Sequence, residues 1–222
     1  MGRKEKDKDF IVPYEVHNHK IMTTMEQEKR NRLIECAMKE FTKGYALANM
    51  DELVKEAGIS KGLLFHYFGT KKGVFLFLFK YALSVINREY EKVIVESGDF
   101  LENIWTVSKL AVDLSFQYPV VYGFLTKSYF SIDDVFPEGL PKDVTSSSDT
   151  LLKKIQESSS KSMFKADIDY KKSQNIILWT MNGFIESLFT YGTDIEAYQS
   201  HYENCMKELD EYLQLLRKLL YR

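Results

Sequence analysis

The side chains that most often perform catalysis are not set at catalytic spacings in this sequence. The four histidines are scattered, neither His-Glu-x-x-His nor Gly-x-Ser-x-Gly occurs, and no glycine-rich phosphate loop follows an expected strand. Cys36 and Cys205 are too few for a four-thiolate zinc site, and we expect both to be buried thiols in a reducing compartment. The sequence therefore argues against an enzyme and indicates neither a metal nor a cofactor.

Residues 50–68, MDELVKEAGISKGLLFHYF, instead have the spacing of a helix-turn-helix, a motif that reads DNA. Asn49 is a good N-cap, and Glu52 three residues later completes a capping box for a helix over residues 50–57. Gly58 supplies the positive φ that the turn needs, and Ser60 caps the next helix. On this spacing alone, an ordinary helical hairpin with a surface lysine remains the alternative.

The second helix of the motif keeps several side chains available once the apolar residues of the pair face inward. These are Lys61, Gly62, Leu63, Phe65, His66 and Tyr67. Such a helix fits the major groove, where a lysine and a glycine near its N-terminus allow close approach to DNA. Lys71 follows directly and is available for a phosphate contact.

Two segments at a fixed offset resemble a known family. The stretch RNRLIECAMKEFTKGY and then NMDELVKEAGISKGLLFHYFGTKKGVF are similar to the N-terminal DNA-binding domain of the TetR/AcrR family of bacterial transcriptional repressors, and the resemblance covers about residues 26–80. It implies a homodimer whose two recognition helices sit in successive major grooves of double-stranded DNA. It also implies a larger C-terminal domain that binds an effector and thereby changes the separation of those helices.

The resemblance assigns roles to particular positions of this chain. The residues that it places at base edges or close to the DNA backbone are Lys61, Gly62, Leu63, Phe65 and His66. Tyr67 and Lys71 fall where the family holds phosphates, and Asn49 caps the supporting helix close to the backbone.

Three residues depart from the family pattern. Leu63 stands where a polar residue is common and Phe65 where Tyr is common, which favours apolar contact with thymine methyl groups over hydrogen bonding. Val54 replaces the usual Ala and enlarges a core side chain, so its neighbours must adjust to avoid overpacking.

The elements that position these residues are all expected to be helical. Gly and Pro make up only 15 of the 222 residues, and long stretches keep helical spacing. We expect a flexible arm over residues 1–22, a three-helix helix-turn-helix domain over 23–70, and a larger helical effector-binding and dimerisation domain over 71–222. The expected helices are 25–43, 50–57, one opening at Ser60, 71–97, 99–117, 120–130, 145–164, 168–191 and 195–220, with a loop over 131–142.

Two of the last helices carry a pattern suited to dimerisation. Thr180, Gly183 and Ser187 form a small-residue face, which permits close helix approach. Leu209, Leu213, Leu216 and Leu220 form a heptad-like stripe. We expect these helices to form a four-helix dimer interface with their symmetry mates. The alternative is that the leucine stripe faces the core of its own domain.

The C-terminal domain is rich in aromatic residues with a few polar ones among them. The candidate effector contacts are Trp105, Asp113, Phe116, Gln117, Tyr122, Trp179 and Asn182. A pocket lined by such residues suits a small hydrophobic or aromatic effector, although the aromatic residues would serve equally well as plain core filling.

Charge and hydropathy support this interpretation. Residues 1–72 carry 14 Lys and Arg against 11 Asp and Glu, whereas residues 73–222 carry 16 against 21, which favours a polyanion partner for the N-terminal part. The longest uncharged stretches have 13 residues, short of the roughly 20 needed to span a bilayer, and no secretory signal is evident. We expect a cytoplasmic DNA-binding repressor released by an effector. The alternatives are a DNA-organising or cell-division protein of the same fold without an effector, and a protein-binding helical module.

Overall fold

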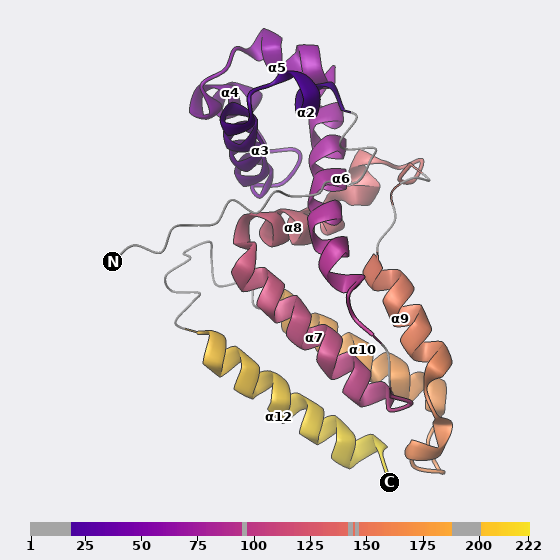
Figure 1. The fold of residues 1–222 in the computed structure, drawn as a ribbon. Coiled ribbons are helices and arrows are strands. Elements are labelled where there is room, and N and C mark those ends of the chain that lie inside the picture. The colour runs from indigo at the N-terminus through magenta and orange to yellow at the C-terminus, as the bar shows by residue number, and fades with distance from the viewer. Residues whose placement is uncertain (1–18, 95–96, 142–143, 145–146, 188–200) are drawn as a thin grey trace.

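The computed structural model describes residues 19–94, 97–141, 144, 147–187 and 201–222, and these residues are arranged almost entirely as helices (Figure 1). The helices are α2 (Lys20–Thr24), α3 (Gln27–Phe41), α4 (Met50–Ala57), α5 (Lys61–Phe68), α6 (Lys71–Tyr90), α7 (Phe100–Gln117), α8 (Pro119–Val135), α9 (Ser147–Ser158), α10 (Tyr170–Ser187) and α12 (Tyr202–Leu220), with a 3-10 turn at Lys161–Met163. The described residues contain no strand, only a lone antiparallel bridge between Phe164 and Tyr221. None of their helices is long and apolar enough to cross a membrane.

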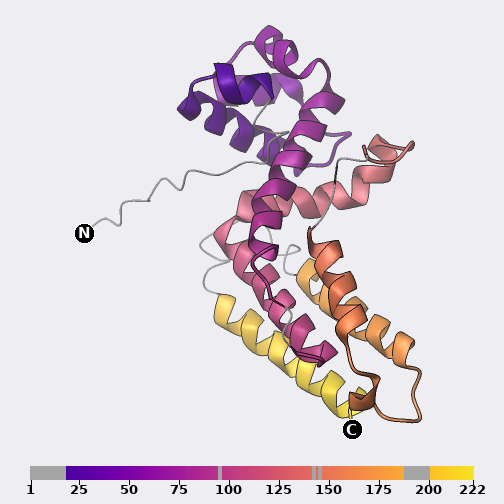
Figure 2. The same cartoon turned by 45° about the vertical axis from the view of Figure 1, so that its right-hand side comes forward.

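The N-terminal helices form a small head on one end of the molecule. Helices α2 to α5 pack together with the first turns of α6 around fully buried side chains such as Phe41, Leu53, Leu64 and Phe75. Figure 2 shows this head above the other helices, with α6 leading from it into the lower part of the molecule. Helix α8 packs against both α3 and α6, so the head rests directly on the second domain.

The second domain is a bundle in which α7 is central. It contacts α8, α9, α10 and α12, and the buried core includes Phe100, Ile155, Ile177 and Leu209. The C-terminus closes this core, because the Tyr221 hydroxyl donates to Asp99 Oδ1 (2.8 Å) and Arg217 pairs with Asp99 Oδ2 (2.9 Å).

Four boundaries differ from the sequence prediction. Helix α9 ends at Ser158 rather than near residue 164, and a separate 3-10 turn at Lys161–Met163 follows it. Residues 20–22 were expected in an arm, but α2 begins at Lys20 because Ile21 is fully buried in the core of the head; residues 1–18 lie outside the described residues. Helix α6 ends at Tyr90 rather than near residue 97, since Tyr90 is the last residue of its buried face and Ile94 is exposed. Helix α8 continues to Val135 through the expected loop and ends just before Phe136, which precedes a proline and packs into the head.

Candidate nucleic-acid interface

The helix-turn-helix is formed by α4 and α5, and its turn has the predicted local chemistry. Asn49 Oδ1 accepts from the backbone N–H groups of Asp51 (2.9 Å) and Glu52 (3.4 Å), so it caps α4 as expected. Gly58 has a φ of +69°, the left-handed conformation that favours glycine, and Ser60 Oγ accepts from Leu63 N–H at 3.1 Å. The two side-chain caps and the glycine turn, all identified from the sequence, therefore mark where α4 and α5 begin and where α4 ends.

One part of the expected capping box is wrong. The Asn49 N–H does not donate to Glu52 but to Glu40 Oε1 of α3, at 2.8 Å. Glu40 is 4% exposed, and its other oxygen pairs with Lys43 at 2.7 Å. This buried carboxylate ties α3 to the start of α4, and the sequence analysis missed it. Glu40 could have been recognised in the sequence as a charged residue on the apolar face of an amphipathic helix.

The exposed side of α5 carries three of the predicted DNA-contacting residues. Lys61 is exposed, and its Nζ is 2.9 Å from Asp51 of α4. Gly62 borders open space, with no atom within 4 Å of the position that a Cβ would take. His66 is also exposed, and its Nε2 is 2.7 Å from Lys20 Nζ. Because these three residues are exposed and Gly62 has no side chain, the surface of α5 can approach a polyanion such as DNA closely.

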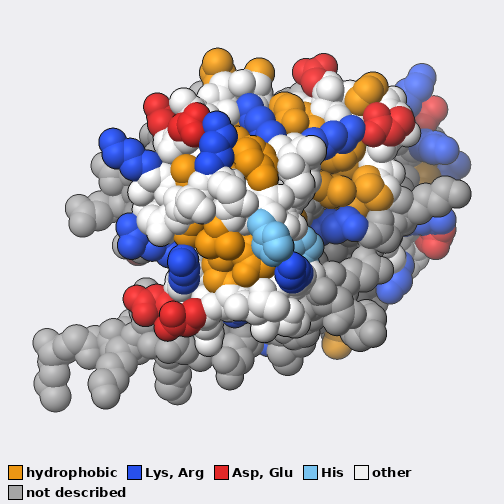
Figure 3. All heavy atoms as spheres, turned by 90° about the horizontal axis from the view of Figure 1, so that it is seen from above, with side chains coloured by type: hydrophobic (Ala, Val, Ile, Leu, Met, Phe, Trp, Pro, Cys, Tyr) orange, Lys and Arg blue, Asp and Glu red, His pale blue; other side chains and the backbone are white. Residues whose placement is uncertain are grey.

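Seen from above, the molecule shows histidine, lysine and arginine side chains around patches of hydrophobic ones, with acidic side chains mostly toward the edge (Figure 3). Part of the apolar component comes from α5 itself, since Leu63 and Phe65 are half-buried and pack against the core of the head. Both residues therefore support the helix with one side and leave the other side accessible.

Tyr67 and Lys71, the two predicted phosphate contacts, are half-buried and held by neighbouring segments. The Tyr67 hydroxyl lies 3.0 Å from Thr24 Oγ1 of α2. Lys71 Nζ donates to the Ala46 carbonyl at 3.3 Å and lies 4.9 Å from the centre of the Tyr45 ring. The Tyr67 hydroxyl and the Lys71 ammonium group are thus held at the end of the recognition helix, and both side chains remain partly exposed.

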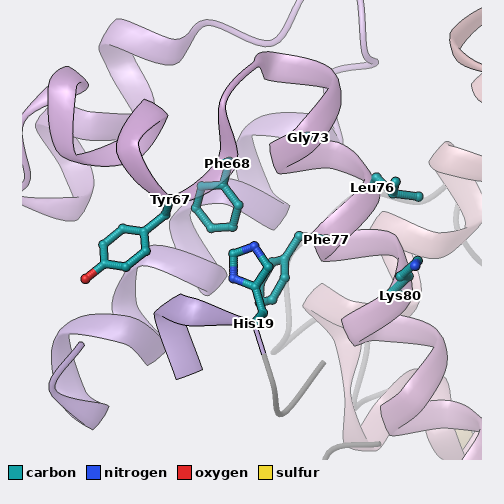
Figure 4. Close-up of a pocket in the computed structure, with 7 residues that line it drawn as sticks. All are labelled: His19, Tyr67, Phe68, Gly73, Leu76, Phe77 and Lys80. Atoms are coloured by element: carbon teal, nitrogen blue, oxygen red, sulfur yellow. The ribbon is translucent and has the colours of Figure 1, made fainter. Parts of the chain in front are cut away.

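His19 belongs to the same region, although the sequence analysis did not select it. Figure 4 shows its ring beside the rings of Phe68 and Phe77. The His19 ring stacks on Phe68 with centroids 5.2 Å apart, and its centroid is 4.6 Å from that of Phe77. Burial lowers the pKa of its imidazole. These residues line an open pocket of about 220 Å³ between α5, α6 and the start of α2. This part of the sequence has no helical periodicity that could have placed His19 beside α5.

The expected effector contacts do not come together as one cluster. Trp105, Phe116 and Tyr122 are half-buried and pack against the core of the second domain. Asp113 accepts a hydrogen bond from the Tyr202 hydroxyl, which helps to raise the pKa of Tyr202 to about 12.

The other three of these residues lie toward solvent. Gln117 is exposed, and its Nε2 donates to the Tyr118 hydroxyl. Trp179 and Asn182 are also exposed, Trp179 by 70%, because they lie on the outer side of α10. The predicted cluster that combined Trp179 and Asn182 with the aromatic residues of α7 and α8 is therefore corrected.

The leucine stripe of α12 faces its own domain. Leu209, Leu213 and Leu216 are 0%, 6% and 5% exposed within the core of the bundle, and Leu220 is half-buried, so the expectation that this stripe faces a partner subunit is wrong. The small-residue face of α10 does lie toward solvent: Gly183 and Ser187 are exposed and Thr180 is half-buried.

The expected burial of both cysteines holds for Cys36, whereas Cys205 is only half-buried.

The two short helices, their glycine turn and the accessible α5 define a helix-turn-helix head of the DNA-binding class. Residues 33–77 match the family model described as bacterial regulatory proteins, tetR family. Over 92 residues the chain is 32% identical to an uncharacterized HTH-type transcriptional regulator, YdgC, of Bacillus subtilis. That alignment covers 41% of this chain and 47% of the relative, so it spans about half the length of the relative.

Solved structures share the fold over most of the chain. A TetR family transcriptional regulator from Chloroflexus aurantiacus superposes with a TM-score of 0.69 at 16% identity, covering 90% of this chain and 96% of that one. The ketosteroid transcriptional regulator KstR2 of Mycobacterium tuberculosis gives 0.56 at 14% identity, covering 89% and 97%. The fatty acid degradation regulator FadR from Bacillus halodurans gives 0.54 at 15% identity, covering 83% and 95%. Residues 33–77 are thus similar to the DNA-binding domain of the tetR family, and the chain shares the all-helical fold of these solved regulators.

Proposed function

We propose that this protein is a sequence-specific DNA-binding transcriptional regulator that acts in the cytoplasm as a homodimeric repressor. The observation that carries the proposal is the accessible side of α5, where Lys61, Gly62 and His66 lie on a rigidly capped helix-turn-helix. A lysine and an imidazole supply hydrogen-bond donors for base edges, and the glycine permits close approach of the backbone. Lys71 and Tyr67 flank this surface as phosphate contacts, and Asn49 caps α4 beside it.

A homodimer supplies the second recognition helix. The exposed apolar residues of α10 and α12 lie at helical spacing on the sides that face away from the core: Ile176 and Trp179 on α10, and Tyr212, Leu215 and Leu219 on α12. Gly183 lies one turn beyond Trp179 and permits close helix approach. We place the dimer interface on this outer face of α10 and α12, together with Thr180 and Ser187, in place of the buried leucine stripe.

An effector is proposed for the second domain, as a small and mainly apolar molecule near Trp105, Phe116 and Tyr122. Helix α6 follows the recognition helix directly, and Tyr90 near its other end has a side-chain hydrogen bond with Tyr122 of α8. A ligand that displaces Tyr122 would therefore move α6, and with it the spacing of two recognition helices that must lie about 34 to 36 Å apart on DNA.

The experiment that tests the proposal is selection of random double-stranded DNA by the full-length protein at about 50 mM salt, where phosphate attraction is strong. We expect enrichment of a two-fold symmetric sequence with half-sites one helical turn apart. A promoter that carries this sequence should be silenced by the protein in a reporter assay. Failure to retain any duplex would contradict DNA binding and favour a protein-binding module, whereas retention without sequence enrichment would favour a DNA-organising role.

A further inference from the structure

Helix α2 and its N-cap residue contact three successive residues of the recognition helix α5. Lys20 Nζ is 2.7 Å from His66 Nε2, and Thr24 Oγ1 is 3.0 Å from the Tyr67 hydroxyl. The third contact is the stack of His19 on Phe68, with an angle of 16° between the rings. The last turn of α5 is therefore set by the short segment that precedes the helix-turn-helix in the chain.

The segment that makes these contacts is itself anchored. Ile21 is fully buried in the core of the head. Arg30 of α3 donates from one Nη1 atom to the carbonyls of Met22 (2.9 Å) and Met25 (3.3 Å), which lie at the end of α2. Thr24 Oγ1 also donates to the Lys20 carbonyl at 2.8 Å. A helix of five residues would not be stable alone, but here its position is fixed by the head.

The chemistry of the Lys20 contact determines which nitrogen of His66 carries the proton. A lysine ammonium group has three donors and no acceptor, so the Nε2 atom that it approaches must accept. The ring proton of a neutral imidazole then resides on Nδ1, which becomes the donor that His66 can present. Oxygen and nitrogen acceptors on guanine, N7 of adenine and O4 of thymine are the groups in the major groove that such a donor can contact.

We propose that Lys20 is a positioning residue for sequence recognition, which holds His66 as the Nδ1–H tautomer so that this group reads a base-edge acceptor in the operator. This inference rests on the proposed function of DNA binding and deepens it, because it assigns part of the specificity to a residue outside the helix-turn-helix. Lys20 itself remains exposed, with its positive charge beside the reading surface.

The first experiment needs no DNA. Two-bond proton–nitrogen correlation spectra of the full-length protein report the tautomer of each imidazole, and the signals of His66 are assigned by their loss in His66→Ala. We expect the Nδ1–H tautomer in the wild type and a mixture in Lys20→Met, which keeps most of the side-chain stem and removes the donor. Lys20→Arg should retain the tautomer. An Nε2–H signal in the wild type would overturn the inference.

The second experiment measures affinity for the selected operator and for its single-base variants. Lys20→Met should lose roughly 5- to 10-fold of discrimination, the lower part of the range for a base contact, at the same base pair that His66→Ala affects. In the His66→Ala background, Lys20→Met should cause no further loss. Lys29→Met removes the same charge from an exposed site on α3 and should leave the preference unchanged.

These outcomes separate the two proposals. If the wild type binds no duplex, DNA binding fails and the recognition role of Lys20 fails with it, even where the spectra show the predicted tautomer. If the wild type selects an operator and Lys20→Met weakens all sequences alike, Lys20 is a phosphate contact, and only the inference about His66 is overturned.

Discussion

Lys71 is the first residue of α6 and follows the recognition helix closely in the chain. Its ammonium group contacts the Ala46 carbonyl and the Tyr45 ring, which lie between α3 and α4. We propose that a group placed there contacts the sugar-phosphate backbone and not the base edges. Lys71→Ala should therefore weaken binding to all duplexes alike and reduce the slope of log affinity against log salt by about 1. Fluorescence anisotropy over a salt series measures both quantities.

The matched control for this substitution is Lys109→Ala, which removes an exposed lysine from α7 in the second domain and should change neither quantity. An affinity and salt slope that Lys71→Ala leaves as in the wild type would remove Lys71 from the interface.

Asn49 stabilises the motif through its side-chain oxygen, which accepts from two N–H groups at the start of α4. Asn49→Ala should lower the free energy of unfolding by about 0.5 to 2 kcal/mol, the usual cost of losing an N-cap. Asn49→Asp keeps an acceptor and should come within a few tenths of a kcal/mol of the wild type. Urea denaturation followed by circular dichroism measures both variants. An equal loss in the two would show that the cap is not the cause.

The sequence predicted well those helix boundaries that capping residues and glycines near the boundary determine. Helix α4 begins and ends where Asn49 and Gly58 predicted, and α7 begins at Phe100, within one residue of the start expected for the helix over 99–117. The ends of α6 and α8 were predicted less well, because they depend on contacts distant in sequence, such as the packing of Phe136 against the head. Helix α2 was missed since its burial rests on one residue, Ile21.

The direction that α12 faces shows why part of the site could not be predicted. Leu209, Leu213 and Leu216 form one apolar stripe, and Tyr212, Leu215 and Leu219 form another beside it. Both stripes have helical spacing, so periodicity does not tell which one meets α7 and which one remains exposed. The tertiary contacts decide it, and they place the first stripe inward. The recognition helix was easier to predict because its caps, turn and reading residues are all local in sequence.

The start of α7 and the C-terminal residues are joined through Asp99. Burial pushes the pKa of this carboxyl upward, but hydrogen bonds from Tyr221 and Arg217 outweigh burial, and the pKa lies below its ordinary value of 3.8. Because the folded pKa is depressed, ionised Asp99 stabilises the fold above about pH 4, and this contribution is lost as the pH falls through the lower folded value.

Asp99→Asn should lower the free energy of unfolding at pH 7 by roughly 1.5 to 3 kcal/mol, the usual contribution of a hydrogen bond to a charged group. It should also flatten the acid dependence below pH 4. Urea unfolding at pH 7 and at pH 3 measures both effects, and Asp167→Asn, at an exposed site, is the control. A variant whose stability falls with acid as steeply as that of the wild type would contradict the assigned role of Asp99.

The outer face of α10 and α12 is the proposed contact between two copies of the chain. Introducing a charge there should separate the copies, because a carboxylate in an apolar interface is desolvated without a partner. Trp179→Glu and Leu215→Glu should therefore convert a dimer into a monomer in analytical ultracentrifugation and weaken operator binding, while leaving the helical circular dichroism unchanged. Both side chains are more than half exposed in a single subunit.

Ile94→Glu is the control for the dimer, since Ile94 is as exposed as Trp179 but lies between α6 and α7 in the chain and belongs to neither α10 nor α12. Leu213→Ala tests the other stripe and should destabilise the fold itself by about 2 to 5 kcal/mol, as expected for a buried leucine. Dimers that persist in both glutamate variants would place the interface elsewhere.

The link between the two domains makes a further prediction about the effector. If a ligand near Trp105, Phe116 and Tyr122 weakens operator binding by some factor, thermodynamic linkage requires that the operator weaken ligand binding by the same factor. Apolar and aromatic compounds that raise the thermal unfolding temperature are the candidates, and operator affinity is then measured with and without each one.

Tyr122→Phe identifies the path of this coupling. It removes the hydroxyl that bonds with Tyr90 and keeps the ring, so the ligand should still bind, and operator affinity without ligand should stay within about twofold of the wild type. The coupling factor should decrease, because α8 and α6 lose this hydrogen bond and keep only their packing contacts. Trp179→Phe, on the outer side of α10, should leave the coupling factor unchanged in a variant that remains dimeric. Ligands that stabilise the protein and leave operator affinity unchanged would rule out release of DNA by an effector, but not DNA binding itself. A ligand that binds the DNA-bound and DNA-free conformations equally well cannot shift the equilibrium between them.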